Sequence, residues 1–108
     1  MKKYKLLRIF LGESDSLEGK PLYIAILDTC MEKGLSGGTA FRGIAGFGHK
    51  RIIHRDRILT LSGDLPVVVE IIGSEDEIAE VMPDLLKIVD GSGLVTIEDI
   101  EVIRPENQ

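Results

Sequence analysis

Residues 65–89, LPVVVEIIGSEDEIAEVMPDLLKIV, contain the clearest structural signal in the chain, a strand joined directly to a helix. Leu65–Ile72 is rich in β-branched residues, and Pro66 lies near its start, where a strand tolerates proline. Ser74 and Glu77 have the spacing of a capping box, in which each side chain bonds a free backbone N–H at a helix start. Apolar residues then recur at helical spacing to the end of the segment, which predicts an amphipathic helix.

The sequence before and after this segment completes a plan of six elements. Tyr4–Leu11 is apolar on both alternating faces, as a central strand is. Pro21–Lys33 has apolar residues at helical spacing, and Gly34 follows it as a helix-ending residue. Gly37–Phe47 and Leu94–Ile97 are compatible with strands. The order β-α-β-β-α-β predicts an α+β, ferredoxin-like (split βαβ) fold, with two helices on one face of an antiparallel sheet.

Prolines and breaks in the pattern lead to five further expectations. Pro21 suits the first residue of its helix, and Pro83 should kink the second helix. Arg57–Leu61 is additional strand material ahead of residue 65. The alternation of Leu94–Ile97 breaks and restarts in the other phase at Ile100–Val102, which predicts a bulge or corner and a short extra C-terminal strand.

A sheet with both helices on one face has a second face that the chain itself leaves uncovered. In this sequence several strands would place apolar residues on that face. An apolar sheet face exposed to water is a predicted association surface, and a closed symmetric oligomer covers it most simply.

Length and composition indicate one domain, residues 1–108, with 44% hydrophobic and 29% charged residues. Cys30 is the sole cysteine, so no intrachain disulfide is expected, as in proteins of a reducing compartment. The N-terminus does not have the pattern of a signal peptide, and no apolar run approaches the length of a membrane span. We therefore expect a cytoplasmic protein without direct membrane insertion.

Basic residues are concentrated in one part of an acidic chain. The stretch from Arg42 to Arg57 contains five basic residues and a single acidic residue, Asp56, so its local charge is +4. The total is −5, so the charges of all other residues sum to −9. Such an island is too local for a nucleic-acid surface and suits an anion or an acidic partner protein, unless it is simply a solvated loop. The candidate partner-binding residues of this loop are His49, Lys50, Arg51, His54, Arg55 and Arg57.

No group of residues in the sequence predicts catalysis. Cys30 lies on the apolar stripe of a helix, where a thiol is usually an inert small hydrophobe. His49 and His54 stand among cations that would repel a metal ion, and a zinc site needs three or four ligands. We therefore expect neither an enzyme nor a metal site.

Two glycine clusters are candidate anion-binding turns, because glycine lets backbone N–H groups approach a ligand closely. The first contains Gly46, Phe47 and Gly48, and the second contains Gly91, Ser92 and Gly93. Glycines at strand ends are also common simply as turns.

Taken together, the motifs resemble those of the PII-like signalling proteins, and in detail an uncharacterised branch of that superfamily. The resemblance covers nearly the whole chain. It rests on Phe41-Arg42-Gly43 before the first glycine cluster, Leu65-Pro66 opening a strand with Glu70-Ile71, the Gly91-Ser92-Gly93 turn, Glu98-Asp99, and the terminal Ile103-Arg104.

The resemblance implies a non-enzymatic homotrimer that binds an adenine nucleotide in clefts between subunits. Both glycine clusters would hold the nucleotide, and Arg104 would reach its phosphates from the neighbouring subunit. The loop Gly48–Asp64 would dock on a regulated protein, such as a membrane transporter or an enzyme. Ser92 and Leu94 replace an acidic residue and a lysine of PII proteins, so this site has less charge for a triphosphate.

Two functions follow from these expectations. The first is a trimeric sensor that binds a small anion, with an adenine nucleotide favoured, and signals through Gly48–Asp64. The alternative is an adaptor without a small-molecule ligand, in which the basic loop binds an acidic partner protein.

Overall fold

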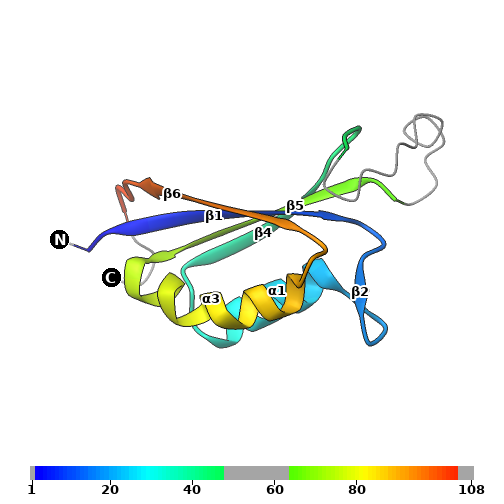
Figure 1. Cartoon of the computed structure of the whole chain (residues 1–108). Helices are drawn as coiled ribbons and strands as arrows, with labels where there is room; N and C mark the ends of the chain where they lie inside the picture. The colour runs from blue at the N-terminus through cyan, green and yellow to red at the C-terminus, as the bar shows by residue number, and fades with distance from the viewer. Residues whose placement is uncertain (1, 48–63, 105–108) are drawn as a thin grey trace.

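The computed structural model describes residues 2–47 and 64–104, which form an antiparallel sheet with two helices on one face (Figure 1). The sheet has the order β4-β5-β1-β6 and contains β1 (Tyr4–Gly12), β4 (Gly37–Arg42), β5 (Pro66–Ser74) and β6 (Leu94–Ile100). The helices are α1 (Leu22–Glu32) and α3 (Glu75–Val89), and a small hairpin of β2 (Ser16–Leu17) and β3 (Lys20–Pro21) precedes α1. The predicted ferredoxin-like, α+β fold is confirmed.

The strand register divides the side chains between a helix-covered face and an open face. Residues directly opposite each other in antiparallel strands share a face, and Leu7 lies opposite both Ile71 and Ile97. Alternate residues of β1 and β5 therefore pack against the helices. The buried core contains Leu7, Ile9, Leu11, Leu22, Ile26, Cys30, Val67, Val69, Ile71, Ile78, Val81, Leu85 and Val89.

The predicted capping box joins β5 to α3. The Ser74 hydroxyl accepts a hydrogen bond of 3.2 Å from the Glu77 backbone N–H. In return, the Glu77 carboxylate accepts a bond of 2.8 Å from the Ser74 N–H. Two donors that the helix itself cannot pair are thus satisfied, so the strand passes into the helix without a loop.

Ser74→Ala should lower the free energy of unfolding by about 1 kcal/mol, because it removes the acceptor of this cap at a buried N-cap position. Chemical denaturation measures the loss. Ser74→Thr keeps a hydroxyl at the N-cap and should unfold close to the parent chain. An equal loss in both variants would show that packing at this position, rather than the cap, supplies the stability.

Two of the boundaries that differ from the sequence-based expectation have a clear physical reason. Helix α1 starts at Leu22, because Pro21 has an extended ψ of 137° and serves as the N-cap. Strand β4 ends at Arg42 and does not reach Phe47. The Gly43 N–H still donates to the Pro66 carbonyl at 2.7 Å, but Pro66 has no N–H to return, so the ladder stops.

The predicted bulge in β6 is wrong. Its pairing with β1 advances one residue at a time, from Phe10 opposite Leu94 to Tyr4 opposite Ile100. β6 is an edge strand with largely exposed side chains, so its sequence does not need strict alternation. Residues 101–104 form no strand, so the expected extra C-terminal strand is not found there, and α3 continues through Pro83. Arg57–Leu61 lies outside the described residues.

Candidate functional site

The two glycine clusters lie at the same end of the sheet. β4 ends there beside β5, and β6 starts there beside Phe10 of β1 (right side of Figure 1). β5 and β1 lie between β4, which precedes the first cluster, and β6, which follows the second. These two outer strands are therefore about 14 Å apart at the usual strand spacing. One copy of the chain therefore brings Gly46–Phe47 and Gly91–Gly93 to one end of the sheet, but on its two opposite edges.

The turn after α3 needs its glycines for different reasons. Gly91 has a φ of +78°, a left-handed conformation that glycine adopts without strain. A Cβ atom at Gly93 would lie 2.7 Å from Leu11 Cδ2 and 3.0 Å from the Phe10 carbonyl oxygen, so the backbone approaches β1 closely. The Ser92 N–H donates to the Val89 carbonyl at 2.5 Å. This backbone N–H is therefore used within the turn. The polar side-chain group that the turn can offer a ligand is the Ser92 hydroxyl.

The first cluster folds back over the start of β5. A Cβ at Gly46 would lie 3.1 Å from Pro66 Cγ, which accounts for the small residue there. Phe47 is 94% exposed, so its ring is open to a ligand or to another molecule. Gly48 and the predicted partner-binding residues, His49, Lys50, Arg51, His54, Arg55 and Arg57, lie outside the described residues.

A polar network that sequence reasoning missed ties together the two chain segments that flank residues 48–63. Arg42, the last residue of β4, forms an ion pair with Glu13. The Glu13 backbone N–H donates to the Leu65 carbonyl at 2.8 Å, and the Ser14 hydroxyl bonds the Asp64 carboxylate at 2.6 Å. We call Glu13, Ser14, Arg42 and Asp64 the loop clamp. The only signal in the sequence was the polar turn that starts at Gly12.

Arg104 lies at the opposite end of the sheet from both glycine clusters. β6 runs from Leu94, beside Phe10, to Ile100, beside Tyr4 at the start of β1. Figure 1 shows the red C-terminal end of the described chain near the N-terminus. A strand of this length spans about 20 Å. Within one copy, the structure therefore does not bring Arg104 to the glycine clusters.

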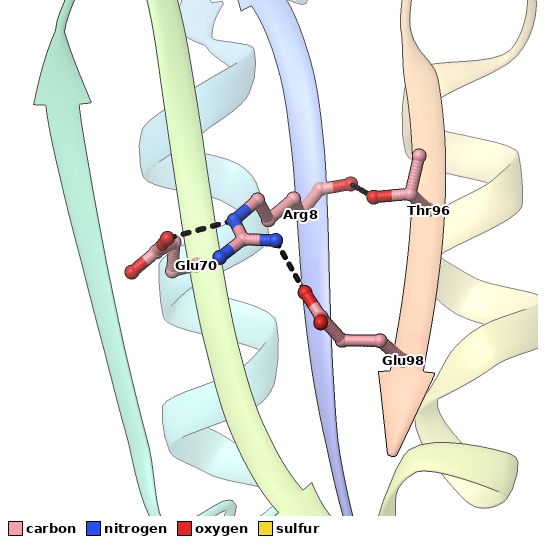
Figure 2. Close-up of polar contacts among 4 residues, drawn as sticks. All are labelled: Arg8, Glu70, Thr96 and Glu98. Atoms are coloured by element: carbon pink, nitrogen blue, oxygen red, sulfur yellow. Dashed lines mark hydrogen bonds and ion pairs between the residues drawn. The ribbon is translucent and has the colours of Figure 1, made fainter. Parts of the chain in front are cut away.

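The open face of the sheet carries a charged cluster at its centre (Figure 2). Arg8 of β1 donates from Nε to the Glu70 carboxylate on β5 at 2.9 Å, and from Nη1 to the Glu98 carboxylate on β6. The Thr96 hydroxyl reaches the Arg8 carbonyl at 3.5 Å. Hydrogen bonds to Glu70 and then to Glu98 raise the pKa of the Arg8 guanidinium, so it stays charged. We call Arg8, Glu70 and Glu98 the Arg8 cluster.

An apolar row crosses the same face next to the Arg8 cluster, on the side toward the glycine clusters. Register places Phe41, Val68, Phe10 and Leu94 opposite one another on the four adjacent strands. Phe41, Phe10 and Leu94 are 51%, 39% and 56% exposed. The apolar, uncovered sheet face expected from the sequence is therefore present in the single chain.

The remaining candidates for chemistry offer little. Cys30 is buried, and desolvation raises the pKa of its thiol to about 11, which keeps it a poor nucleophile near neutral pH. Residues 2–47 and 64–104 contain no group of three or more potential metal ligands. In the same ranges, no helix is both long and apolar enough to cross a membrane.

Known proteins with similar sequences and structures agree with the fold. A model of the DUF190 family (Uncharacterized ACR) matches residues 4–102. A UPF0166 protein of Aquifex aeolicus (strain VF5) is 46% identical over 101 residues, which is 94% of each chain. A solved structure of a putative PII-like signaling protein from Thermus thermophilus is similar with a TM-score of 0.66 and 17% identity, over 95% of this chain and 92% of the other.

A second solved structure is that of CPII from Thiomonas intermedia K12, a nitrogen regulatory PII-like protein bound to ADP, AMP and bicarbonate. It is similar with a TM-score of 0.65 and 17% identity, over 94% of this chain and 90% of the other. These likenesses confirm the resemblance inferred from the sequence motifs. The chain belongs to the DUF190 family and has the fold of the PII-like proteins.

Proposed function

We propose that this protein is a non-enzymatic, cytoplasmic regulator that binds a small anionic ligand between the subunits of a homotrimer, with an adenine nucleotide favoured. The observation that carries the proposal is the placement of its candidate residues. The glycine clusters and Arg104 lie at opposite ends of one copy, so a site that contains both needs a second copy. The fold supports this proposal, since CPII has the same fold and binds ADP and AMP.

The chemistry of these residues favours a nucleotide with few phosphates. Phe47 offers an exposed ring on which an adenine can stack, and Gly46 leaves room beside it. The Ser92 hydroxyl and the Arg104 guanidinium supply the phosphate contacts. Arg104 is the one cation among the proposed ligand contacts, and charge-assisted bonds are roughly twice as strong as neutral ones. We therefore expect AMP or ADP to bind more tightly than ATP.

The signal would leave through residues 48–64. The loop clamp, to which Asp64 belongs, holds the chain on both sides of residues 48–63, and its residue Arg42 ends the strand that leads into the Gly46–Phe47 turn. A ligand against Phe47 would therefore contact the chain close to the start of this segment. The basic residues Lys50, Arg51, Arg55 and Arg57 suit an acidic surface on a regulated protein, such as a transporter or an enzyme.

A thermal-shift panel tests the ligand. ATP, ADP, AMP, cyclic nucleotides, bicarbonate and other simple anions would be added to the purified protein. A ligand at one hundred times its dissociation constant stabilises the fold by about 2.7 kcal/mol, which is readily seen in a domain of this size. Arg104→Glu should abolish the shift, because it places a like charge beside the phosphates.

Lys33→Glu is the matched control, since it makes the same charge change on the exposed C-cap residue of α1, at the end of that helix that lies away from the glycine clusters. It should keep the full ligand-induced shift. A shift that survives Arg104→Glu would remove Arg104 from the site. A panel without any hit would instead favour the adaptor function, in which Lys50→Glu and Arg51→Glu abolish capture of an acidic partner.

A further inference from the structure

We infer that the Arg8 cluster makes the contact between copies over the open face of the sheet tighten as the pH falls. The inference rests on the proposed homotrimer and adds how its assembly is regulated. It starts from the charges on the face that the single chain leaves uncovered.

A second copy is the occupant that best fits this face. The row Phe10, Phe41, Val68 and Leu94 is apolar across all four strands, half-buried at Val68 and exposed at the other three residues, which is typical of an association surface. The row ends near the two glycine clusters, while Arg104 lies at the far end of the sheet. A neighbouring copy that supplies its Arg104 to the ligand site must therefore lie close to the glycine clusters of this copy. An interface over the open face would bring it there.

The face carries an unbalanced set of charges. β1 contributes Tyr4 and Arg8, β5 contributes Glu70, and β6 contributes Glu98. β4 contributes Thr39 and Phe41 to this face and adds no charge. Lys5 and Asp99 lie opposite each other on the helix-covered face and pair there. One guanidinium thus serves two carboxylates, which leaves one negative charge per copy.

Exposure to water makes this imbalance acceptable in the single chain. The side chains of Arg8, Glu70 and Glu98 are 39%, 32% and 52% exposed. Association would remove that water from all three. Arg8 compensates one carboxylate, and burial of the second favours its protonated, neutral form. The assembled state therefore binds more protons than the separated copies, so association strengthens as the pH falls.

Self-association measured by sedimentation equilibrium at pH 7.5 and pH 5.5 tests the inference. The parent chain should associate more tightly at pH 5.5. Glu98→Gln removes the uncompensated charge, so it should associate on the order of tenfold more tightly at pH 7.5 and lose most of the pH dependence. Arg8→Gln leaves two unpaired carboxylates and should associate at least about tenfold more weakly at pH 7.5.

Asp99→Asn is the matched control, because it makes the same charge change one residue along β6 on the other face. It should keep the pH dependence of the parent chain. All variants share His49 and His54, so the difference between Glu98→Gln and Asp99→Asn isolates the open face. Thermal unfolding at a concentration where the chains are dissociated reveals any loss of fold.

The outcomes separate this inference from the proposed function. A trimer with the same stability at both pH values would overturn the proton linkage and leave the proposed trimer intact. Weaker association of Glu98→Gln would overturn the charge argument, because Glu98 would then pair with a cation of the other copy. A monomer under every condition would overturn both the interface and the proposed trimer. The ligand-induced thermal shift is measured independently of all three.

Discussion

Leu85→Ala is expected to lower the free energy of unfolding by about 3 kcal/mol, within the range of roughly 2–5 kcal/mol for such truncations in cores. Leu85 is 0% exposed and lies on the face of α3 that packs against the sheet. Its removal takes three carbon atoms out of close packing and leaves a cavity that the surrounding core residues, such as Val81 one turn earlier, can fill only in part. Urea denaturation at a fixed chain concentration measures the loss.

The next residue of the same helix provides the control. Leu86 is 51% exposed, so Leu86→Ala should change the free energy of unfolding by less than about 0.5 kcal/mol. Both variants replace leucine by alanine, a better helix former, so helix propensity does not separate them. Equal losses would contradict the orientation of α3 on the sheet.

Gly91→Asp should weaken binding of an anionic nucleotide by at least about tenfold, because a carboxylate would stand beside its phosphates. Gly91 is well suited to this test. No atom lies within 4 Å of a Cβ placed there, and Asp and Asn both tolerate its φ of +78° better than most residues. Gly91→Asn has nearly the same shape without the charge, and it should bind almost as the parent chain does.

A mixing experiment asks whether the site is shared between copies. Gly91→Asp and Arg104→Glu chains, each impaired in binding on its own, would be refolded together in equal amounts. In a cyclic trimer, each mixed assembly has one interface where an intact glycine turn meets an intact Arg104, so about one quarter of all sites should recover. Isothermal titration counts them. No recovery from a properly mixed population would place both residues in the same copy, or outside the site.

Features governed by neighbours in the sequence could be predicted, and features governed by distant strands could not. The capping box of Ser74 and Glu77 and the helix-ending Gly34 involve contacts within a few residues. The end of β4, in contrast, depends on Pro66, which lies more than twenty residues further along the chain. The error in β6 arose because an edge strand, exposed on most of its length, does not need the alternation that marks a central one.

The same distinction applies to the candidate site. The glycine clusters could be identified as turns from the sequence, because closely spaced glycines at the end of an apolar segment are a local signal. The position of Arg104 at the opposite end of the sheet could not, since it follows from the direction of β6. The Arg8 cluster was missed because its members come from three strands and meet only through the register. The indication that the sequence did contain was a single arginine between Leu6 and Phe10, on an otherwise apolar strand face.

The loop clamp separates the part of the domain that fixes its shape from residues 48–63, the segment proposed to recognise a partner. Glu13, Ser14, Arg42 and Asp64 fasten both flanks of residues 48–63 to the sheet without using any residue between them. Doubling the length of a closed loop costs only about 0.6 kcal/mol of closure entropy, less than the contribution of a good helix cap. The scaffold can thus accept a new insert at this position, and under the proposed function a lineage could change its binding partner by exchanging one segment while the fold stays the same.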